Sequence, residues 1–162
     1  MVKQEGAIGT MWASGKKVAA GFTSRLKATF FGGGTVPTAT WTKMEFKGVA
    51  YDNDSEVDIV TTYRWNVAAT GVYRITAMAT IVGMPSTDGM GFVCKIYKNG
   101  SSAEHGTNGV RGGGGAGLVT SIHTTCLELT AGDYIEVFAH QDTGVDKGIS
   151  SQANYMTAER IG

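Results

Sequence analysis

The stretch from Gly71 to Val82 reads Gly-Val-Tyr-Arg-Ile-Thr-Ala-Met-Ala-Thr-Ile-Val. Every second residue from Tyr73 to Ile81 is apolar, while an arginine and two threonines occupy positions between them. Alternation over this length is typical of a β-strand that presents one face to a core. The stretch therefore predicts a long central strand, with Tyr73 and Ile75 on its buried face.

The rest of the chain carries the same kind of pattern in shorter runs. Glycine-containing turns separate these runs, and Asn99-Gly100 is a strong hairpin signal because both residues tolerate positive φ. No stretch has apolar residues at helical spacing. The further runs lie at residues 25–30, 38–47, 92–98, 118–130, 134–140 and 154–161. Eight to ten short strands predict an all-β, two-sheet sandwich or jelly roll.

Length and composition exclude several classes of protein. A chain of 162 residues is expected to form one globular domain, and a hydrophobic content of 42% is too high for disorder. Basic and acidic residues balance at 14 each, which argues against a nucleic-acid protein that binds by bulk charge. No run of eighteen apolar residues occurs, so we expect no membrane-spanning helix.

Residues 1–24 follow neither a strand period nor a helix period and predict an irregular N-terminal arm before a globular head at residues 25–162. The arm is not a collagen stalk, because Trp12 and Val18 occupy positions that a triple helix reserves for glycine. It also begins without the apolar segment of a secretory signal, so we expect no ordinary secretory signal.

The front of the chain is basic, since residues 1–47 hold seven basic and two acidic residues, a net charge of +5. Two interpretations stay open: a solvated basic face, or an arm that docks on an acidic protein partner. If the arm docks, Trp12, Lys16 and Lys17 are the expected attachment residues. A large aromatic side chain in an irregular segment gains most from burial in a partner's pocket.

Four short segments occur in the same order as matching segments of a known protein family. They are Phe46-Lys-Gly-Val-Ala-Tyr51-Asp52, Tyr63-Arg-Trp65-Asn-Val-Ala-Ala-Thr-Gly71-Val72-Tyr73, Tyr97-Lys98-Asn99-Gly100 and Leu127-Glu-Leu129-Thr-Ala-Gly132-Asp133-Tyr-Ile135-Glu-Val137. This order, over residues 25–162, resembles the complement globular-head family, which shares its fold with tumour necrosis factor-like proteins. The resemblance implies a ten-strand jelly roll that assembles as a homotrimer and binds other molecules without catalysis.

Within that resemblance, six residues are candidates for the core or the trimer axis: Trp65, Tyr73, Ile75, Tyr134, Phe138 and Tyr155. Stalkless heads of this family occur on phage particles, so we expect a virion surface protein made in the bacterial cytoplasm. It would be a tail-associated minor protein or receptor-binding tip. A capsid decoration or head-fibre protein is the alternative, and a bacterial surface or secreted binding module is the second alternative.

The expected partners are further copies of the chain, other virion proteins and a host cell-surface receptor or glycan. We expect no nucleic acid and no membrane insertion. An enzyme is not expected either, because His105, His123 and His140 accompany no nucleophile at a recognisable spacing.

An acidic loop carries Asp52, Asp54, Glu56 and Asp58, the chemistry that Ca²⁺ prefers in its ligands. The EF-hand template fails, because Val57 stands where that template needs glycine. A calcium site and a solvated acidic loop both stay open, and no other cofactor is expected. Cys94 and Cys126 are expected to be two buried free thiols.

Overall fold

The computed structural model describes residues 25–29, 34–84, 91–103, 117–151 and 154–162. These residues form thirteen β-strands and no helix, so none of them supplies a helix that could cross a membrane. The longer strands are β1 (Arg25–Thr29), β4 (Gly48–Asp52), β6 (Arg64–Asn66), β7 (Gly71–Met84), β8 (Phe92–Lys98), β10 (Gly117–Leu129), β11 (Tyr134–Gln141) and β13 (Tyr155–Arg160). The two-residue strands are β2 (Thr35–Val36), β3 (Thr42–Lys43), β5 (Val57–Asp58), β9 (Ser101–Ser102) and β12 (Lys147–Gly148).

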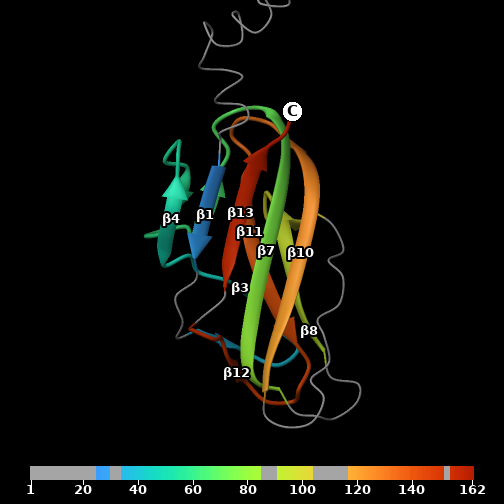
Figure 1. Cartoon of the computed structure of the whole chain (residues 1–162). Coiled ribbons are helices and arrows are strands. Elements are labelled where there is room, and N and C mark those ends of the chain that lie inside the picture. The colour runs from blue at the N-terminus through green and yellow to red at the C-terminus, as the bar shows by residue number, and fades with distance from the viewer. Residues whose placement is uncertain (1–24, 30–33, 85–90, 104–116, 152–153) are drawn as a thin grey trace, which may run out of the picture.

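The strands form two antiparallel layers (Figure 1). The first, called here the β7 sheet, has the order β10-β7-β13-β1-β4; the second, the β11 sheet, has the order β5-β6-β11-β8-β9, with β3 also paired to β11. A small β12-β2 pair lies outside both. Figure 1 shows the β7 sheet in front of β11 and β8. Strands far apart in sequence are neighbours, as β1 and β13 are, which is typical of a jelly roll.

The core lies between the two sheets. Tyr73, Ile75, Ala77, Ala79 and Ile81 all point inward and are buried, which confirms the alternation read from the sequence. The alanines leave little bulk, and the sheets approach closely beside them. The buried thiol of Cys94 on β8 donates to the Ala77 carbonyl at 3.7 Å and to the Ser121 carbonyl at 3.3 Å. Strand β10 therefore closes the sandwich against β8.

The predicted all-β, two-sheet jelly roll is confirmed, with several short strands in place of a few longer ones. Residues 38–47 illustrate the difference, because only Thr42 and Lys43 are in a strand there. Ala39 adopts a φ of +55°, which interrupts an extended chain before that strand. The Asn99-Gly100 hairpin is confirmed, with φ values of +52° and +78° that match the turn expected between β8 and β9.

The two cysteines differ, and the prediction that both are buried is wrong for one of them. Cys94 is buried, whereas Cys126 is exposed, and both are free thiols. On β10 the odd-numbered residues from Val119 to Thr125 point into the core and the even-numbered ones point outward. Cys126 falls in the outward set, so the pleat of the strand and not the apolar character of the side chain decides its position.

Candidate functional site

The carboxylate of Asp58 is held by the loop that follows it. Its oxygens accept backbone N–H bonds from Val60 at 2.8 Å and from Thr61 at 3.0 Å, and hydroxyl bonds from Thr61 at 2.5 Å and Thr62 at 2.6 Å. These bonds, the Thr61 hydroxyl first among them, hold the pKa of Asp58 well below its usual range. The charged form of Asp58 thus organises the chain between β5 and β6.

Glu56 lies buried beneath the same loop. Its carboxylate accepts a hydrogen bond from Nε1 of Trp65 and another from the backbone N–H of Ala68 at 3.0 Å. Burial raises the pKa of Glu56, and the Trp65 hydrogen bond works against that rise. The side chain therefore satisfies two donors at the edge of the core and points away from solvent.

The four acidic residues do not converge. Asp52 accepts backbone bonds from Val57 at 2.8 Å and from Asp54 at 3.4 Å, so its oxygens also serve the loop itself. Within the part of the chain that the structure describes, no group of three or more His, Cys, Asp or Glu side chains is placed to hold a metal ion. The calcium hypothesis thus gains no support from the positions of Asp52, Asp54, Glu56 and Asp58. The predicted attachment residues Trp12, Lys16 and Lys17 lie outside the described residues.

The outer surface of the β7 sheet, called the β7 face, carries an ordered ladder of side-chain pairs. The register of β7 and β10 sets Val82 opposite Leu118 and Met78 opposite Ile122. Threonine pairs alternate with these apolar pairs: the hydroxyls of Thr76 and Thr124 are 2.9 Å apart, and those of Thr80 and Thr120 are also 2.9 Å apart.

Much of the β7 face is apolar and open to solvent. Leu118 is 64% exposed and Ile122 is 52% exposed, which are high values for side chains of this kind. Contiguous apolar surface on a soluble domain marks a site of contact with something else. Val82, opposite Leu118, is also exposed on β7.

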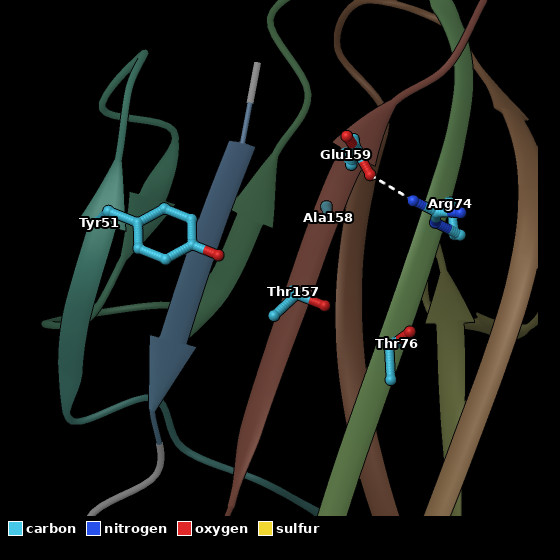
Figure 2. A pocket seen from close by; sticks show the side chains of 6 residues that line it. All are labelled: Tyr51, Arg74, Thr76, Thr157, Ala158 and Glu159. Atoms are coloured by element: carbon cyan, nitrogen blue, oxygen red, sulfur yellow. Dashed lines mark hydrogen bonds and ion pairs between the residues drawn. The ribbon is translucent and has the colours of Figure 1, made fainter. Parts of the chain in front are cut away.

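A hollow of about 420 Å³ lies on the β7 face between β4 and β7. Figure 2 shows Tyr51 from β4 across from Arg74 and Thr76 of β7, with residues of β13 between them. Arg74 and Glu159 form an ion pair at 2.5 Å, which leaves the hollow without net charge. Its remaining lining is Thr157 and Ala158.

The outer surface of the β11 sheet, called the β11 face, carries aromatic and basic side chains in place of the aliphatic and threonine pairs of the β7 face. Four rings touch in sequence there: His140 and Trp41 at 4.9 Å between centroids, Trp41 and Tyr97 at 6.3 Å, and Tyr97 and Phe138 at 4.2 Å. Two cations lie over rings on this face, Lys95 over Trp41 at 4.7 Å and Arg64 over Tyr134 at 4.3 Å. This face thus combines aromatic surface with positive charge.

The six core or trimer candidates separate into two groups. Trp65, Tyr73 and Ile75 lie in the core of the single chain, where Trp65 and Tyr73 make an edge-to-face contact at 5.1 Å. Tyr134 and Phe138 are half-buried on the β11 face, and Tyr155 is half-buried on β13 with Lys27 above its ring. Trp41 is not among the six candidates from the sequence, and its contacts with Tyr97 and His140 were not predicted. The available signal was the alternation in β11, whose outward residues are mostly aromatic.

The two sheets and their strand order define a structural class, the tumour necrosis factor-like jelly rolls. The chain is similar to Eiger TNF from S. frugiperda, with a TM-score of 0.58 and 16% identity over 86% of this chain and 94% of that one. It is also similar to murine APRIL in crystal structures at pH 8.0 and pH 8.5, with TM-scores of 0.56 and 0.53 and identities of 15% and 14%. These matches cover 85% of this chain and 98% and 99% of APRIL. No protein-family model and no curated protein sequence matches the chain. At this identity, the similarity shows the fold.

Proposed function

We propose that the chain is a homotrimeric, non-enzymatic attachment protein of a phage particle, held on the virion by residues 1–24. In this role it is a tail-associated minor protein or a receptor-binding tip. A capsid decoration or head-fibre protein is the alternative, and a bacterial surface or secreted binding module is the second. The tumour necrosis factor-like fold supports a binding or structural role, which all three have in common.

The main support for the proposed trimer is the composition of the β7 face. Its apolar pairs, Val82 with Leu118 and Met78 with Ile122, offer surface whose burial is favourable. The threonine pairs on either side of Met78 and Ile122 are already hydrogen-bonded to each other, so covering them leaves fewer polar groups without a partner. A face with these properties fits a second copy of the same chain, and the resemblance to complement globular heads makes the closed assembly a trimer.

A charge placed among the apolar pairs of the β7 face tests this assembly. Ile122→Arg puts a guanidinium where the proposed interface is dry, so the variant is expected to remain folded and to become monomeric. Val60→Arg is the matched control, because Val60 is 73% exposed in the loop between β5 and β6. Light scattering should give one-third of the wild-type mass for Ile122→Arg and an unchanged mass for Val60→Arg. Equal masses for both variants would place the interface elsewhere.

The particle assignment rests on the resemblance to stalkless phage heads and on the character of the arm. Trp12 is a large aromatic side chain in a segment without a pattern of its own, and Lys16 and Lys17 supply positive charge beside it. Ordering such a segment costs free energy that an anchor residue must supply. The arm is therefore the part of the chain that we assign to docking on an acidic site of the particle.

Truncation and localisation test the particle assignment. Removal of residues 1–20 should leave a trimer that no longer joins virions, and Trp12→Ala should weaken attachment by about 2 kcal/mol or more. Full occupancy of particles by the truncated protein would contradict the docking role of the arm. Antibody labelling at the tail favours the first assignment, labelling over the head favours decoration, and labelling of the bacterial envelope alone favours the second alternative.

A further inference from the structure

The β11 face carries a platform of rings that the core does not require. Strand β11 alternates strictly: Ile135, Val137 and Ala139 point into the core, and Phe138 and His140 point outward. The neighbouring strand β8 adds Tyr97 on the same outer side, next to Phe138 with centroids 4.2 Å apart. A solvent-facing strand position is ordinarily polar in an antiparallel sheet, so this row of aromatic side chains points to a ligand.

Trp41 completes the platform from the side of β3. It is 36% exposed, lies 4.9 Å from the His140 ring and 6.3 Å from the Tyr97 ring, and therefore presents indole surface to solvent beside them. The outward residues of β11 from Tyr134 to His140 span about 20 Å at the usual rise of a strand. A surface of this length and shape accommodates a short chain of flat-faced units.

Lys95 and Arg64 supply positive charge on this face, and the oxygens of Asp58, the register partner of Arg64 on β5, bond to their own loop. The Lys95 ammonium lies 4.7 Å from the Trp41 ring centre, and the Arg64 guanidinium lies 4.3 Å from that of Tyr134. Neither cation forms an ion pair with another residue in the described ranges, whereas Glu136 is neutralised by Lys43. Both residues are half-buried, and Nε of Arg64 donates to Oδ1 of Asn66 at 2.8 Å. The Lys95 ammonium and the remaining N–H groups of Arg64 stay available to an anionic ligand.

We propose that the β11 face binds an anionic saccharide. The C–H faces of sugar rings stack on Trp41, Tyr97 and Phe138, and Lys95 and Arg64 bind the carboxylate, sulfate or phosphate groups that the saccharide carries. This inference deepens the proposed binding function and rests on it. It is compatible with the proposed trimer, because the β7 face and the β11 face lie on opposite sides of the sandwich (Figure 1).

Binding of defined saccharides tests the proposal on the full-length protein. The anionic probes are an oligogalacturonate, an oligosialic acid and a heparin tetrasaccharide, and the neutral counterpart is the methyl ester of the same oligogalacturonate. By calorimetry at low and physiological salt, we expect at least one anionic probe to bind. The ester should bind at least tenfold more weakly than its parent acid if that acid binds. Failure of all three anionic probes, or equal binding of acid and ester, would overturn the proposal.

Variants locate the binding on this face. Trp41→Ala should weaken binding of the best anionic probe at least tenfold, and Trp41→Phe should retain part of it, because a ring remains for stacking. Lys95→Ala should weaken binding severalfold and reduce its salt dependence. Lys47→Ala is the matched control, since Lys47 lies 5.0 Å from the Tyr63 ring, outside the platform. Unchanged binding by Trp41→Ala, or an equal loss in Lys47→Ala, would contradict the assignment.

Two further probes separate the saccharide from other anions. A thymidine oligonucleotide supplies bases that stack and phosphates that pair with cations, and a polyglutamate peptide supplies carboxylates without rings. Tighter binding of either than of every saccharide would overturn the proposal. Light scattering on the same samples keeps the two proposals distinct: a trimer that binds no saccharide contradicts only the present inference, and a monomer that binds one contradicts only the assembly.

Discussion

Met78 on β7 stands directly opposite Ile122 on β10, on the face of the β7 sheet that points away from the core. Hydroxyl-paired threonines lie on either side of this apolar pair, Thr80 with Thr120 and Thr76 with Thr124. Among the described residues of one chain, Met78 of this pair is half-buried and Ile122 is 52% exposed. In the proposed trimer the pair lies in the interface, and this difference makes the surrounding side chains reporters of assembly.

Thiol reactivity is the first such reporter. Cys126 is exposed on the β7 face opposite Arg74, and Cys94 is buried between the sheets, where burial raises the pKa of its thiol. We expect Cys126 to react with a maleimide more slowly in the wild type than in the Ile122→Arg variant, because assembly covers it. Cys94 should react only on unfolding in both proteins. Equal Cys126 rates, measured by mass spectrometry, would argue against a covered face.

The buried Glu56 predicts a difference between two substitutions. Glu56→Ala leaves the Trp65 indole N–H and the Ala68 N–H without their acceptor and should lower the free energy of unfolding by about 1–3 kcal/mol. Glu56→Gln removes the cost of burying a charge and keeps an acceptor for one of the two donors, which bond to different oxygens of Glu56, so it should lose less stability than Glu56→Ala. Denaturant melts of the Ile122→Arg background would measure this without the effect of assembly. A larger loss in Gln than in Ala would show that the charge itself is required.

Asp133 predicts how stability depends on pH. Its carboxylate accepts the Thr130 N–H at 2.8 Å and an Asn99 amide bond at 2.8 Å, and it pairs with Lys98 at 2.9 Å. These contacts, the Thr130 bond first, lower the pKa of Asp133 from 3.8 to about 2. The folded chain therefore binds this proton less readily than the unfolded chain, so the stabilisation is present above pH 3.8 and is lost as the pH falls towards 2.

Substitution of Asp133 tests whether stability falls with pH in this direction. Asp133→Asn should be less stable than the wild type at pH 7 and should lose less of its stability between pH 4 and pH 2. Asp146→Asn is the control, because Asp146 is exposed in the loop after β11. Thermal melts over this range measure the slope, and parallel curves for the wild type and Asp133→Asn would contradict the role of Asp133.

The sequence was most informative where one periodicity acts alone. The alternation from Tyr73 to Ile81 predicted the face, the strand and the burial correctly, because a period of two permits only one orientation against a core. Asn99-Gly100 predicted its hairpin because few residue pairs accept two positive φ angles. Both signals are local, so the strand and the hairpin can be predicted without knowledge of the rest of the fold.

The surfaces were harder to predict, because they depend on which strands become neighbours. Trp41, Tyr97 and Phe138 are far apart in sequence and meet only because β3 and β8 both pair with β11. The acidic loop shows the opposite problem: its composition suggested a metal site, but the position of Glu56 under Trp65 depends on how the loop folds back. Residue type alone does not specify whether a carboxylate faces solvent or the core.

The mass of the protein in solution tests the central claim most directly. Sedimentation equilibrium on the wild type at micromolar concentration should give three times 17.0 kDa, about 51 kDa. A stable, folded species of 17.0 kDa would contradict the account, because the β7 face would then be open to solvent in the functional protein.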